Sequence, residues 1–118
     1  MYKRQAGIRA GTWVAGARVL DVYKRQTQGE RRALCEQRKR LLLDAAEALD
    51  AHHIKVGDFL NTPCPMPQLI DSFAALCEQA AARGTDVLFE LMPFAQIHTL
   101  PGALELVTGA GAVNGRCV

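Results

Sequence analysis

One segment constrains the fold more than any other. Residues 86–92, Asp-Val-Leu-Phe-Glu-Leu-Met, are apolar on both alternating faces apart from Glu90. Successive side chains of a strand point to opposite faces of its sheet, so this run predicts a strand with apolar cover on both sides. Such strands are typical of parallel sheets, whose strands are joined by long crossovers, usually helices. The segment therefore predicts an α/β fold.

The residues before this strand predict an earlier strand and a helix that connects the two. Residues 54–59 are short and β-branched at two alternate positions, which predicts a strand, and the Pro-rich residues 61–67 predict a loop. Apolar residues then recur at intervals of three and four, so a helix is expected to begin at Pro67 and to stop at Gly84. The two strands are predicted to be parallel neighbours.

An amphipathic helix is predicted from Glu30 to about Asp50, with Arg38-Lys39-Arg40 on its solvated face. The apolar residues at helical spacings are Ala33, Leu34, Leu41, Leu42, Ala45, Ala46 and Leu49.

A last helix is predicted from its cap Thr99 to about Thr108, before Gly109 and Gly111 break it. A third strand should follow and is missing. Two parallel strands with three helices fit either a barrel or an open doubly wound sheet.

The ends of the chain point to a different origin. Tyr-Lys-Arg-Gln occurs at residues 2–5 and again at 23–26, and the second copy lies in a longer stretch that a common transposase sequencing adapter encodes. Another frame of that adapter gives residues 116–118. We expect residues 1–26 to be adapter-derived or chimeric, with a basic disordered arm as the alternative, and 116–118 to be an adapter-derived tail. The domain is then residues 27–115.

Charge and hydropathy exclude several classes of protein. The 14 basic and 12 acidic residues give a net charge of +2. Without the expected adapter residues, nine basic and eleven acidic residues remain, so nucleic acid is not an expected partner. No run approaches the roughly 20 apolar residues that cross a bilayer, and no signal peptide is evident, so no membrane association and a cytoplasmic location are expected. The four cysteines form no C-x-x-C pair and are expected to be reduced.

Glu90 carries the clearest chemical signal. A carboxylate at the carboxyl end of an apolar parallel strand must be ion-paired, metal-bound or protonated. Active sites of parallel barrels lie at that end. A functional carboxylate is favoured, and a structural ion pair is the alternative.

Two residues of the preceding strand and one that ends it accompany Glu90. If the β-branched residues of that strand face the helices, Lys55 and Gly57 point to the other side. Lys55 is then placed to pair with Glu90, and Gly57 leaves room for a ligand. Asp58 is expected to bind substrate hydroxyls or to cap its loop.

The histidines divide between the two ends of the sheet. His98 follows the Glu90 strand, where it is expected either to contact substrate or to be an ordinary loop residue. His52 and His53 precede their strand at the opposite end, so solvated or core-edge roles are expected rather than metal binding.

The stretch from Asp44 to Gly115 resembles consecutive βα units of the sugar phosphate isomerase/epimerase family, which are xylose isomerase-like TIM barrels. The most specific piece is Phe89-Glu90-Leu91-Met92-Pro93 after a Gly-terminated helix. The resemblance implies a fragment of a (β/α)8 TIM barrel, about a third of the roughly 250 residues of a complete one.

The resemblance also implies a chemistry. The family's glutamate on this strand is a metal ligand and an acid/base carboxylate, which carries over to Glu90 alone. A divalent ion (Mn, Mg, Zn or Co), a small sugar or sugar phosphate substrate, and isomerisation or epimerisation through an enediolate follow from it. The family's other ligands have no counterpart here, so the fragment itself is expected to be inactive.

Two alternatives stay open. The same barrel resembles apurinic/apyrimidinic endonucleases, which would need more histidines at strand ends and a basic surface. A small non-catalytic α/β interaction module would need a partner to cover its sheet edges.

Overall fold

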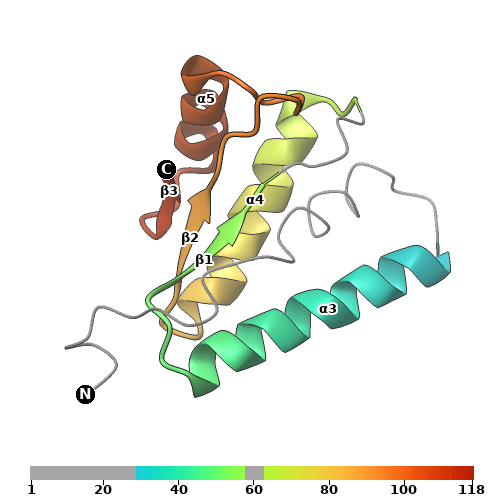
Figure 1. Ribbon diagram of the computed structural model, residues 1–118, viewed down its shortest axis with the longest axis vertical. Helices are drawn as coiled ribbons and strands as arrows, with labels where there is room; N and C mark the ends of the chain where they lie inside the picture. Colours follow the sequence, from blue (N-terminus) through green and yellow to red (C-terminus); the bar gives the residue numbers. More distant parts are fainter. Residues whose placement is uncertain (1–28, 58–62) are drawn as a thin grey trace.

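The computed structural model describes residues 29–57 and 63–118, so the expectations for residues 1–26 and for Asp58 lie outside the described residues. The predicted α/β class with parallel strands is confirmed (Figure 1). The elements are, in order, α3 (Gly29–Ala48), β1 (His53–Val56), α4 (Met66–Ala81), β2 (Asp86–Phe89), α5 (Leu100–Ala110) and β3 (Gly115–Cys117).

The sheet has three strands in the order β1-β2-β3, so the expectation of two strands was wrong. Gly115 and Cys117 of β3 lie in register with Val87 and Phe89 of β2. Asn114, expected only to help break the helix, anchors the start of β3. Its side-chain amide donates to the Cys77 carbonyl at 2.8 Å and to the Thr85 carbonyl at 3.1 Å.

Helices α4 and α5 pack against each other, α4 also against β2 and β3, and α5 against β3. Both therefore cover one face of the sheet (Figure 1). The ring of Phe73 in α4 meets Phe89 edge to face, with centroids 6.3 Å apart. Consecutive strand order with helices on one face occurs in barrels and in one half of a doubly wound sheet alike.

The strands are fully buried on the helix side alone. Ile54, Val56, Val87 and Phe89 are buried, whereas the alternate residues of β1 and β2 are only partly buried. The prediction that β2 has apolar cover on both faces was therefore wrong for its Leu88 side. A strand whose residues are apolar on both faces can therefore be fully buried on one face only.

The buried side of α3 differs from the predicted one. Leu43 and Ala46 join the core, but Leu41 and Leu49 are 59% and 45% exposed. The run Leu41-Leu42-Leu43 points apolar side chains in three directions, about 100° apart, so its pattern does not select one face. Lys39, assigned to the solvated face, is buried, and its Nζ lies 2.6 Å from Glu36 Oε2.

Local signals set the helix ends. Pro67 lies in the first turn of α4, and Gly84 adopts φ +70° in the turn before β2. Thr99 caps α5 by accepting a hydrogen bond from the Gly102 amide at 3.2 Å, and Gly111 ends it with φ +64°. Within residues 29–57 and 63–118, no helix has the length and apolar character needed to cross a membrane.

Candidate functional site

The carboxyl edge of the sheet places Glu90 beside the end of β1. The Glu90 amide donates to the Val56 carbonyl at 2.8 Å, which extends the pairing of β1 and β2 by one residue. On the other side, the Val118 amide donates to the Phe89 carbonyl at 2.9 Å. Glu90 therefore stands at the centre of this edge, between the ends of two neighbouring strands.

The structure brings Lys55 and Glu90 together, as the alternation of β1 predicted. Ile54 and Val56 face the core, so Lys55 projects from the opposite face, and its Nζ lies 3.9 Å from Glu90 Oε1. The two side chains are 35% and 40% exposed. This separation is that of a loose ion pair rather than a hydrogen bond, so Lys55 supplies positive potential without fully occupying the carboxylate.

Gly57 does not leave open space for a ligand. A Cβ atom at this position would lie 3.2 Å from the Glu90 carbonyl oxygen and 3.7 Å from Met92 Cε. The absent side chain instead allows the backbone that carries Glu90 to approach β1 closely. Gly57 thus contributes to the placement of the carboxylate, and its predicted role was wrong.

A pair of hydrogen bonds, which sequence reasoning missed, joins the two loops at this edge. The Cys64 amide donates to Gln96 Oε1 at 2.9 Å, and Gln96 Nε2 donates to the Cys64 carbonyl at 2.6 Å. The side chain of Gln96 therefore mimics a strand partner for the loop before α4. A contact across 32 residues leaves no local signal in the sequence.

His98 lies exposed in the loop between β2 and α5. Its Nδ1 is 3.1 Å from the Ala95 carbonyl oxygen and 3.2 Å from that of Gln96. Because β2 ends at the carboxyl edge and α5 begins after it, His98 belongs to the loops on the Glu90 side of the sheet.

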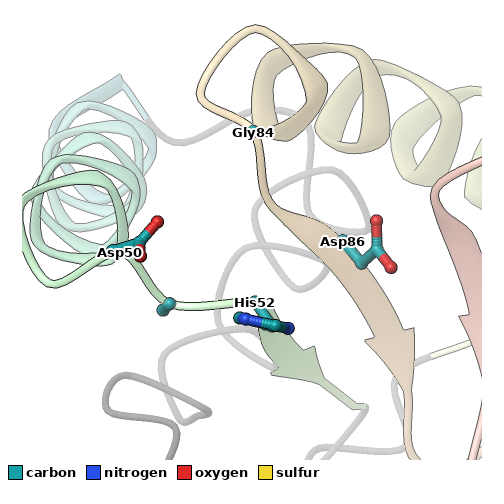
Figure 2. Close-up of a pocket in the computed structure, with 5 residues that line it drawn as sticks. Asp50, His52, Gly84 and Asp86 are labelled. Atoms are coloured by element: carbon teal, nitrogen blue, oxygen red, sulfur yellow. The ribbon is translucent and has the colours of Figure 1, made fainter. Parts of the chain in front are cut away.

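The opposite, amino edge has a hollow of about 310 Å³ (Figure 2). His52 is exposed beside it, and Asp50, Gly84 and Asp86 contribute to its walls. The Asp86 carboxylate turns toward β3, where its Oδ2 lies 3.4 Å from Arg116 Nη2. The hollow lies at the other end of β2 from Glu90, so it is not part of the carboxyl-edge site.

The described residues do not form a complete metal site. In the part of the chain that the structure describes, no three His, Cys, Asp or Glu side chains gather as metal ligands. At the carboxyl edge, Glu90 could supply one carboxylate ligand to a metal ion. The neighbouring Lys55 ammonium group would repel such a cation.

Comparison of the chain with models of known protein families, with curated proteins and with solved structures finds no match.

Proposed function

We propose that this chain is part of a sugar or sugar phosphate isomerase/epimerase with a TIM-barrel fold, and that Glu90 is its acid/base carboxylate. The observation that carries the proposal is the position of Glu90 at the carboxyl edge of a parallel sheet, beside Lys55. The resemblance of residues 44–115 to the family supports it, and the strand order with α4 and α5 on one face is compatible with it, as it is with half of a doubly wound sheet.

The chemistry of Glu90 follows from its setting. An ionised carboxylate at the mouth of the sheet removes the proton from a carbon next to a carbonyl, and the electron pair of the C–H bond forms an enediolate. The protonated Glu90 then returns the proton to the neighbouring carbon on the same face, which isomerises the sugar. Epimerisation of a single carbon would need a second acid on the opposite face of the enediolate, and the described residues do not supply one. The Lys55 ammonium group, 3.9 Å from Glu90 Oε1, adds positive potential where the negative charge of the enediolate develops.

A divalent ion would polarise the carbonyl and hydroxyl oxygens of the substrate when bound. Glu90 supplies one oxygen ligand toward it, and the described residues do not supply the others. The chain as it stands is therefore expected to bind such an ion weakly and to have no isomerase activity.

The test is Glu90→Gln in the protein encoded by the source gene, once that gene has been sequenced without adapter DNA. Sugar and sugar phosphate substrates are incubated in deuterium oxide, and deuterium uptake at the carbon next to the carbonyl is measured. The variant is expected to lose about 10²- to 10⁴-fold in rate, because it lacks the base. Glu105→Gln, an exposed change on α5, is the matched control and should keep full activity. Equal rates in the two variants would refute the proposal.

A further inference from the structure

The hydrogen bonds of His98 fix which ring nitrogen carries the proton. Both groups near Nδ1, the Ala95 and Gln96 carbonyls, are acceptors only. Nδ1 must therefore carry the hydrogen that it shares between them. In the neutral ring, Nε2 is then left with its lone pair as an acceptor.

The loop that holds His98 is itself braced. The Ala95 amide donates to the Met92 carbonyl at 3.0 Å, and Gln96 is tied to the backbone of Cys64 on both sides of its amide group. The two carbonyls that orient the imidazole are thus held by the fold, while the ring itself is exposed. This arrangement fixes the direction of an exposed side chain.

We propose that His98 presents Nε2 as a neutral hydrogen-bond acceptor for a hydroxyl group of the substrate. This inference rests on the proposed function, since it takes a sugar as the ligand of this edge. A hydroxyl donor is favoured over a metal ion because His98 belongs to no group of three potential metal ligands among the described residues. His98 is then a binding residue that orients the sugar toward Glu90.

The tautomer is tested on the 118-residue chain itself. Labelling the histidines with ¹⁵N and comparing the wild type with His98→Gln identifies the ring signals of His98 among those of three histidines. In the neutral ring, Nε2 of His98 should show the chemical shift of an unprotonated nitrogen. A signal from the Nε2–H form, or an even mixture of the two forms, would overturn the inference without bearing on Glu90.

The role in binding is tested in the protein from the uninterrupted gene with two variants. His98→Asn keeps a donor in the place of Nδ1 but removes Nε2, so kcat/KM should fall about tenfold, mainly through KM. His98→Gln places an amide oxygen near the position of Nε2 and should recover part of the loss. Unchanged kinetics in His98→Asn would overturn the binding role, whereas full activity in Glu90→Gln would overturn the proposed function instead.

Discussion

Glu90 and Lys55 lie close enough to influence each other but too far apart to stabilise the fold appreciably. Ion pairs between half-exposed side chains contribute little to stability, because solvent screens them. Glu90→Gln is therefore expected to change the free energy of unfolding by less than about 0.5 kcal/mol. Urea denaturation of both chains measures the difference. A loss of more than about 1 kcal/mol, twice the expected limit, would show that the Glu90 carboxylate has a structural role.

Cys77 is the residue with the clearest shift in pKa. Burial, and secondarily the charge of Asp86, raise its pKa from 9.0 to about 11. A folded-state pKa above the unfolded value means that stability is fully present below pH 9 and is lost as the pH rises through 11. We predict a loss of roughly 2–3 kcal/mol across this range.

The measurement for Cys77 is the free energy of unfolding at several pH values between 8 and 11, about the window that the two pKa values define. Cys77→Ala is the control, because it lacks the titrating thiol and should show a shallower slope. Identical slopes in the two proteins would contradict the assignment. Native Cys77 should also react with iodoacetamide more slowly than the partly exposed Cys117.

Contacts of single residues could be predicted from the sequence where they depend on the alternation of side chains along a strand. The partnership of Lys55 with Glu90 followed from the two-residue period of β1, which sends Lys55 away from Ile54 and Val56. The brace between Gln96 and Cys64 had no such signal, because it depends on how two loops meet in space. Asp58 was a predicted site residue outside the described part of the chain.

Among the elements, the crossover between β1 and β2 was predictable, whereas α3 and β3 were not. The apolar positions of α4 select one face, and Pro67 and Gly84 mark its ends. By contrast, the consecutive leucines of α3 leave its orientation to tertiary packing. The three residues of β3 show no apolar alternation, and their pairing depends on Asn114 and on β2.

Gly109 illustrates how a glycine expected to end a helix can serve packing instead. It lies inside α5, and a Cβ there would be 2.6 Å from Ile70 Cδ1 on α4. Ile70 Cδ1 is the far end of a flexible side chain and can move, but Cγ1 would also lie 3.1 Å away, so Gly109→Ala is expected to gain less than the roughly 1 kcal/mol that alanine usually adds in a helix. Ile70→Val removes the crowded methyl group, so the same change should be more favourable by at least about 0.5 kcal/mol in that background.

Chemical denaturation of the wild type, the two single variants and the double variant gives this coupling energy. The double variant is predicted to be more stable than the sum of the two single changes implies. Additive effects would mean that α4 and α5 are not in close contact at Gly109.

In the molecule as a whole, the two outer strands of the sheet have unpaired edges among the described residues. β1 and β3 are the outer strands of the sheet, and each has a pairing edge that no other described strand occupies. Large apolar side chains are also exposed, including Leu100 and Leu104, which lie one turn apart on α5. Such surfaces favour association with other chains, or pairing with further strands and helices of a larger sheet.

The 118-residue chain expressed alone is therefore predicted to associate through these edges as its concentration rises. Two-dimensional amide NMR and sedimentation across a range of concentrations test this. Association that increases with concentration is expected, with amide signals that broaden as the concentration rises. Sharp, dispersed signals from a monomer would show instead that the three-stranded sheet is self-sufficient.

Whether the chain is part of a larger barrel is decided by the sequence of the source gene, amplified from the original DNA and read from a library prepared without transposase. Both copies of Tyr-Lys-Arg-Gln are predicted to disappear from that sequence. The strand beside β2 is predicted to continue into residues that include an Asp and a nearby His, which would face Glu90 across the carboxyl edge. If the gene instead keeps both copies and ends at Val118, the isomerase proposal is contradicted and the chain is a small α/β protein in its own right.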